Sequence, residues 1–180
     1  DMTKTDATHY YYTHTVGAGN GAATVALSIG TDVATNVITA TPTSGETFTV
    51  DNTAPTAPTA VTFTPVGGTV VTNALNATNT NFTATSTITA AEATGGTAEL
   101  LKGGASFSTP ITDTSIGAGD TSVSFDGGFT TNAQVQTAFA SGATLSVKLT
   151  DVAGNFTTSS AANPTITVDY IAPTASAPTS

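Results

Sequence analysis

Acidic and amide side chains are the residues of this chain whose types and positions could do chemistry. Asp51 and Asn52 stand directly before a Pro-rich segment, and Asp151 and Asn155 share the phrase TDVAGN. Carboxylate and amide oxygens are the ligands that Ca²⁺ prefers, and Ca²⁺ tolerates irregular geometry, so oxygens scattered over loops suffice. The sequence therefore raises the question of which elements would bring these residues together.

The charge balance excludes one class of partner. The 180 residues hold 12 Asp and Glu but only 3 Lys and Arg, which gives a formal net charge of −9. Binding to nucleic acid needs a basic surface for the phosphate backbone, so we do not expect it. No stretch approaches the roughly 18 consecutive apolar residues of a membrane span, and no signal sequence opens the chain. The start in mid-phrase at Asp1 indicates a mature product or a segment of a longer protein.

Catalytic chemistry has little support in the sequence. The chain has no cysteine, and the spacing of His9 and His14 would place them on opposite faces of a strand. The phrase GAGNGA at 17–22 leads into a strand pattern, and not into the helix whose N-terminus would bind a phosphate. The chain also lacks a G-x-S-x-G nucleophile elbow and any Trp. We expect a protein that is not an enzyme.

The chain repeats one of its own phrases. The sequence LSIGTDVATNVITATPTSGETFTVDNTAPTAP at 27–58 aligns with LSVKLTDVAGNFTTSSAANPTITVDYIAPTAS at 145–176. Each copy reads as a strand, T-D-V-A-x-N, a variable loop, a second strand, an Asp and a Pro-rich exit. Repetition of this kind indicates modules in tandem. We predict the C-terminal half of a module at 1–51, a complete module at 52–169 and a Pro-rich linker to a following module at 170–180.

Short segments of the complete module alternate apolar and polar residues, the period of strands with one buried face. The residues predicted to face the core are Val61, Phe63, Phe82, Ala84, Ser86, Ile88, Val123, Phe125, Leu145, Val147, Leu149, Ile166 and Val168. Polar residues at the alternate positions suit two stacked antiparallel sheets, each with one dry and one wet face. About seven strands of this kind predict an all-β, immunoglobulin-like antiparallel β-sandwich.

Two local motifs add detail to this fold. The segment TAELLKGGASFST predicts a hairpin that turns at Gly103 and Gly104. The segment TTNAQVQTAFASG at 130–142 predicts one short helix, because Thr131 and Gln134 have the spacing of a capping box. Gly142 can end that helix.

These residues carry a family resemblance. The phrase TDVAGN at 150–155, the strand ending in TVD and the D-x-x-A-P-T linker resemble the bacterial Ig-like repeats of large secreted surface proteins, including adhesins and S-layer proteins. The resemblance covers essentially the whole chain, although Thr35 replaces the glycine in the first copy. It implies a spacer or assembly module, often stiffened by calcium, at the bacterial cell surface or secreted.

The topology of such a sandwich predicts where the acids gather. In an antiparallel seven-strand unit, the loops at about 90–96, 112–120 and 151–163 return to the end where the first strand enters. We therefore expect a bridging Ca²⁺ at the joint between modules, with oxygens from Asp51, Asn52, Glu92, Asp113, Asp120, Asp151 and Asn155. The alternative is that these residues only cap turns, with Gly154 supplying a positive φ.

Three functions are compatible with these observations. The first is a structural segment of a repeat protein, such as an adhesin stalk, S-layer or surface fibre, whose partners are neighbouring modules or copies of itself. The second is a filament subunit whose half module is completed by a strand from another chain, with Tyr10, Tyr11 and Tyr12 at the interface. The third is an accessory module of a secreted enzyme that binds host or surface glycans.

Overall fold

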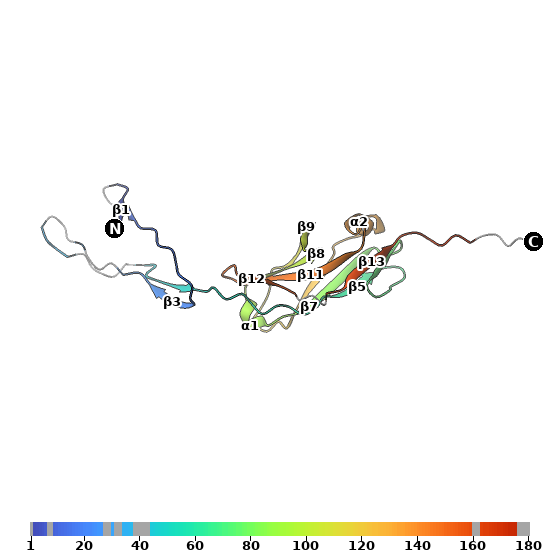
Figure 1. Ribbon diagram of the computed structural model, residues 1–180, viewed down its shortest axis with the longest axis horizontal. Coiled ribbons are helices and arrows are strands. Elements are labelled where there is room, and N and C mark those ends of the chain that lie inside the picture. Colours follow the sequence, from blue (N-terminus) through green and yellow to red (C-terminus); the bar gives the residue numbers. More distant parts are fainter. Residues whose placement is uncertain are drawn as a thin grey trace, which may run out of the picture. The chain divides into compact units, whose positions relative to one another are not determined.

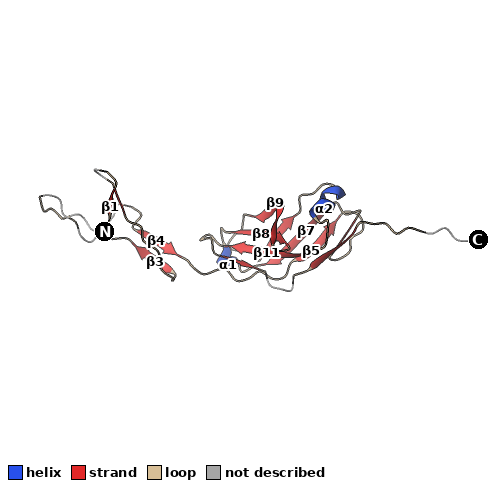
Figure 2. Cartoon of the chain, turned by 45° about the horizontal axis from the view of Figure 1, so that its top comes forward, coloured by secondary structure: helices blue, strands red, loops and turns tan. Residues whose placement is uncertain are grey.

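The protein is described by a computed structural model covering residues 2–6, 9–26, 30, 34–37, 44–159 and 163–175 (Figure 1). The chain divides into two compact units, Asp1–Thr53 and Ala54–Ser180, which we call unit 1 and unit 2. The secondary structure of the described residues is mostly strands in antiparallel sheets, with two short helices (Figure 2). The prediction of an all-β sandwich is therefore confirmed. None of the described helices is long and apolar enough to cross a membrane.

Unit 1 is built from short strand pairs. Strand β1 (Thr3–Lys4) pairs with β2 (Tyr10–Tyr11), and β3 (Gly21–Thr24) pairs with β4 (Thr47–Val50), both antiparallel. None of its described residues is buried. Residues 27–29, 31–33 and 38–43 of the first copy of the repeated phrase, Asp32 among them, lie outside the described residues.

Unit 2 contains two sheets. The smaller sheet has the order β10-β7-β5, all antiparallel. The larger has the order β6-β13-β11-β8-β9, with β12 paired to β11 as well. Their bounds are β5 Thr62–Val66, β6 Ala74–Asn76, β7 Asn81–Thr87, β8 Thr97–Lys102, β9 Ala105–Asp113, β10 Ser122–Asp126, β11 Ala143–Thr150, β12 Phe156–Thr158 and β13 Thr165–Asp169.

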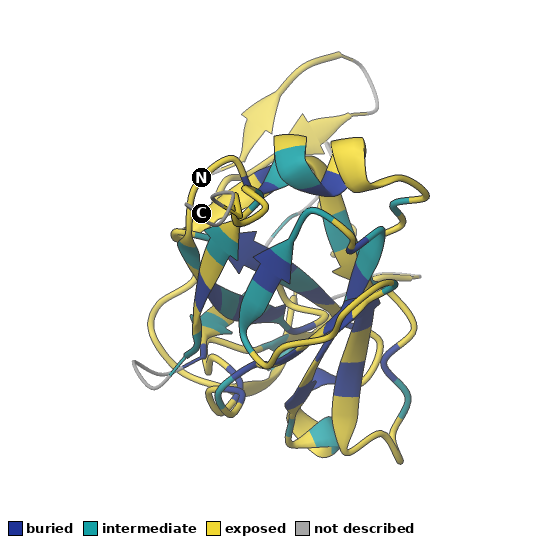
Figure 3. Cartoon of the chain, turned by 90° about the vertical axis from the view of Figure 1, so that its right-hand side faces the viewer, coloured by how far each residue is buried: buried dark blue, intermediate teal, exposed yellow. Residues whose placement is uncertain are grey.

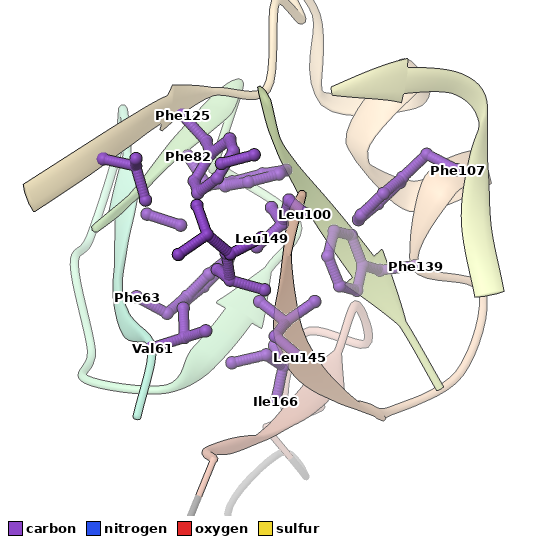
Figure 4. Close-up of a cluster of buried hydrophobic side chains, with 14 of the residues drawn as sticks. Val61, Phe63, Phe82, Leu100, Phe107, Phe125, Phe139, Leu145, Leu149 and Ile166 are labelled. Atoms are coloured by element: carbon purple, nitrogen blue, oxygen red, sulfur yellow. The ribbon is translucent and has the colours of Figure 1, made fainter. Parts of the chain in front are cut away.

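The core of unit 2 fills the space between these sheets (Figures 3 and 4). All thirteen residues predicted to face the core do so: eleven are buried, and Ile88 and Val168 are partly buried. Phe82 lies at the centre, with ring centroids 5.1 Å from Phe63, 5.5 Å from Phe139, 5.9 Å from Phe129 and 6.2 Å from Phe107. The alternation of the sequence therefore marks the core faces correctly.

The hairpin and the capping box are also present. Gly103 and Gly104 form the turn with φ of 59° and 80°, the left-handed region that glycine adopts without strain. Helix α2 (Asn132–Ala138) begins at the N-cap Thr131, whose side chain accepts a hydrogen bond from the Gln134 backbone N–H. The Gln134 side chain in turn accepts from the N-cap backbone.

Three details differ from the expectation. A second helix, α1 (Ala90–Ala93), replaces part of an expected loop, and β6 pairs with β13 in parallel. Helix α2 ends at Ala138, so Gly142 does not end it. Gly142 instead allows a close approach of two strands, because a Cβ there would lie 2.6 Å from the Ile166 carbonyl oxygen.

Candidate functional site

Three connections of unit 2 meet at one end of the sandwich. Thr97 at the start of β8 pairs with Thr150 at the end of β11, and Ala98 pairs with Asp113 at the end of β9. The segments that precede β8 and follow β9 and β11 therefore leave the larger sheet at the same end. Helix α1 lies at this end and α2 at the opposite one (Figure 1).

Close backbone contacts join these connections. The Gly95 N–H donates to the Ile116 carbonyl oxygen at 2.8 Å. A Cβ on Gly96 would lie 2.1 Å from the Thr150 carbonyl oxygen and 3.0 Å from the Cα of Asp151. Only glycine permits backbone approach at that distance. The loops after α1, β9 and β11 thus form one packed surface.

Asp151 and Asn155 close the turn between β11 and β12. The carboxylate of Asp151 accepts from the Asn155 backbone N–H at 2.9 Å and from Asn155 Nδ2 at 3.0 Å. Gly154 has a φ of 93°, and Asp151 is only 8% exposed. This pair is in direct contact, and its geometry is that of a side-chain-capped turn.

Glu92 holds the segment through which the chain enters unit 2. This residue lies in the first turn of α1, and its Oε2 accepts from the Thr56 backbone N–H at 2.5 Å. The bond from Thr56 lowers the pKa of the exposed Glu92 carboxyl. Pro55 and Pro58, on either side of Thr56, are both buried. The entry segment is therefore fixed to the end of the sandwich that carries the acidic loops.

Asp113 and Asp120 also accept bonds within local turns. Oδ1 of Asp113 accepts from the Ser115 N–H and hydroxyl, each at 3.1 Å. Oδ2 of Asp120 accepts from the Gly117 N–H at 2.7 Å. Within the described residues, these bonds leave the second carboxylate oxygen of Asp113 and of Asp120 unused.

Asp51 and Asn52 belong to unit 1 and make their contacts there. Oδ1 of Asp51 accepts from the Thr53 N–H at 3.0 Å. Asn52 donates from its backbone to the Asn20 side chain and from Nδ2 to the Gly19 carbonyl oxygen. The structure describes the two units separately, so Asp51 and Asn52 are placed within unit 1 only.

The predicted ligands are thus distributed over several turns. Of the seven, Asp151 and Asn155 are directly bonded to each other. In the part of the chain that the structure describes, no three His, Cys, Asp or Glu side chains lie close enough to hold a metal ion. His9 instead contacts its neighbour Asp6, with 2.8 Å between Nδ1 and the carboxylate.

The sequence predicted no role for a groove of unit 2 that lies between β9 and α2. It is a cavity of about 470 Å³ lined by β9, by the loop after β10 and by α2. Asp126 and Gln134 contribute polar groups, and Phe129 contributes an aromatic ring. The phrase FDGG, an acid followed by two glycines at the end of a strand, is the signal that points to this loop.

Comparison with known proteins adds no assignment to these sites. The chain matches no family model, no curated protein and no solved structure.

Proposed function

We propose that the chain is a non-enzymatic structural segment of an extracellular bacterial repeat protein, such as an adhesin stalk, S-layer or surface fibre. The supporting observation is that the two repeated exits share one geometry. Asp51 directly follows β4 and Asp169 is the last residue of β13, and each accepts a 3.0 Å hydrogen bond at Oδ1 from the backbone N–H two residues later. The same turn at the end of two copies of T-x-T-V-D is expected of modules joined in series, each in contact with its neighbours only.

We also propose that Ca²⁺ stiffens the joint between modules. Its ligands would come from Asp51, Asn52, Glu92, Asp113, Asp120, Asp151 and Asn155. The donors are hard oxygens, which suits Ca²⁺, an ion that takes about six to eight oxygen ligands. The second carboxylate oxygens of Asp113 and Asp120 provide acceptors beyond those used in turns. The chain has a net charge of −9, so a divalent cation would also relieve repulsion among its carboxylates.

Calcium titration of the whole chain tests this function. A ligand that binds only the folded state stabilises it by about 2.7 kcal/mol at a hundred times its Kd, so the melting temperature should rise with Ca²⁺. Asp51→Ala should remove the response. Asp169→Ala is the matched control, because Asp169 makes the same turn at the other exit, and it should keep the response. A wild-type chain whose melting and small-angle scattering do not change with Ca²⁺ would contradict the calcium joint.

One observation favours a second function, assembly by strand donation. Unit 1 has no buried residue among those described, and its Tyr10, Tyr11, Tyr12 and Phe48 side chains are between 43% and 61% exposed. A two-stranded sheet is marginally stable alone, so a strand from another chain would complete it. Electron microscopy of concentrated protein should then show filaments in which unit 1 resists protease. Monomers at all concentrations would favour the spacer function.

A further inference from the structure

The groove of unit 2 originates in an irregularity of the β8–β9 hairpin. Leu100 pairs with Ile111, but Leu101 pairs with Ser106, so residues 107–110 have no partner on β8. This bulge lies on β9, the edge strand of the larger sheet. A bulge bends its strand and redirects its side chains. The bulge in β9 lines the cavity of about 470 Å³. It also lines an adjoining cavity of about 590 Å³, and both cavities include Phe107, Phe129 and Gln134 in their lining.

Asp126 supplies a fixed hydrogen-bond acceptor to this groove. Its Oδ1 accepts from Asn81 Nδ2 at 2.6 Å and from the Gly128 N–H at 2.8 Å. The bond from the Gly128 backbone, with the one from Asn81, lowers the pKa of Asp126, so the carboxylate is ionised at neutral pH. Both bonds use the same oxygen, and Oδ2 has no partner among the described residues.

Gln134 supplies a fixed donor. Its Oε1 accepts from the backbone N–H groups of Thr130 and Thr131 at 2.9 and 3.1 Å, so the capping box sets the orientation of the amide. The Nε2 group therefore carries two N–H donors, and neither has a partner among the described residues. The groove thus offers an acceptor from the β10 loop and a donor from α2.

Apolar surface lies beside these polar groups. Phe129 is half-buried, packs against Phe82 and lines both cavities. Ser108 and Thr109, exposed on the bulge, add hydroxyl groups to the lining. Lys102 lines the adjoining cavity, and its Nζ donates to the carbonyl oxygen of Ala138, a residue that lines both cavities.

We propose that this groove binds a neutral saccharide. A sugar hydroxyl both donates and accepts, so adjacent hydroxyls can donate to Asp126 Oδ2 and accept from Gln134 Nε2. The C–H face of a sugar ring can pack on Phe129, an apolar surface beside polar groups. The carboxylate of Asp126 and the net charge of −9 disfavour anionic sugars. This binding is separate from the proposed calcium joint, because its residues lie outside the predicted ligand set.

Titration of the whole chain with a panel of neutral and acidic oligosaccharides, followed by NMR, tests the proposal. We expect a neutral saccharide to shift the amide signals of Asp126, Phe129 and Gln134. Gln134→Glu keeps the acceptor of the capping box but removes the donor, and Asp126→Asn keeps one acceptor but replaces Oδ2 with a donor. Each should weaken binding by about tenfold, equivalent to about 1.4 kcal/mol. Asp169→Asn, the same change at a residue that lines neither cavity and lies outside the proposed calcium ligands, should bind like wild type.

Three outcomes would overturn the proposal. The first is that no neutral saccharide shifts these signals at about 10 mM, a concentration that would detect even weak, millimolar binding. The second is that both groove variants keep wild-type affinity while melting like wild type. The third is that sialylated or sulfated saccharides bind more tightly than neutral ones.

Discussion

Strand β4 with the following Asp51 reads TFTVD, and strand β13 reads TITVD, but the two strands lie in different surroundings. Phe48 of β4 is 43% exposed, whereas Ile166 at the corresponding position of β13 is completely buried. In unit 1, β4 pairs with β3. In unit 2, β13 pairs with β11 and β6, and Ile166 belongs to the core between two sheets. The comparison teaches that alternation defines a face, but a second sheet is needed to bury it.

This difference means that unit 2 gains most of the free energy of folding that comes from apolar burial. Burying one large apolar side chain contributes about 1.5–3 kcal/mol relative to leaving it exposed. All the buried hydrophobic residues of the described chain lie in unit 2. Unit 1 gains little from this source, so substitutions matched between the units should have very different effects.

The largest difference is expected from truncating one phenylalanine in each unit. Phe82→Ala removes a completely buried ring that contacts four others, and should lower the free energy of unfolding by about 3–5 kcal/mol. Phe48→Ala removes a partly exposed ring and should stay within about 0.5 kcal/mol. Urea denaturation of the whole chain measures both. A large effect of Phe48→Ala would mean that unit 1 buries this ring in solution, as assembly would require.

An intermediate difference is expected from adding one methyl group to a glycine in each unit. The Cβ of Gly96→Ala would collide with the Thr150 carbonyl oxygen at 2.1 Å, so this variant should lose about 1–3 kcal/mol. Gly17 in unit 1 has open space around its Cβ position, so Gly17→Ala should be nearly neutral. Thermal melting compares the two. Equal melting temperatures would show that the loops at this end of unit 2 are not closely packed.

The smallest difference is expected from one carboxylate in each unit. The lowered pKa of Glu92 means that its ionised form stabilises the fold; this contribution is complete above the ordinary pKa of 4.5 and is lost as pH falls through the lower folded value. Glu92→Gln should therefore lower the urea midpoint at pH ~7, and this effect should shrink as the pH falls and the carboxyl becomes protonated. Glu46→Gln in unit 1 controls for the lost charge. A Glu92→Gln effect of the same size in acid would show that the packing of this side chain, and not its charge, stabilises the fold.

The sequence predicted the strand faces, the hairpin and the start of α2. These features depend on neighbours along the chain. Alternation has a period of two residues, and the pair Thr131 and Gln134 lies within one helical turn. Val61, Phe82 and Leu145 were recognised as core residues for this reason. The predicted calcium ligands could be placed only in part from the sequence. The turns around Asp113 and Asp151 are local, but contacts between acids on separate loops depend on the tertiary structure.

Tertiary structure decided the remaining features. Strand β6 has only three residues, too few to show a period, and its parallel pairing with β13 joins residues about ninety positions apart. The groove requires Asn81 to orient Asp126 while a bulge in β9 opens the edge of the sheet. Tertiary structure also buries Ile166 and leaves Phe48 exposed, although the two residues lie in nearly identical strands. A strand's own residues determine which side is apolar, whereas desolvation of that side depends on surfaces supplied by distant parts of the chain.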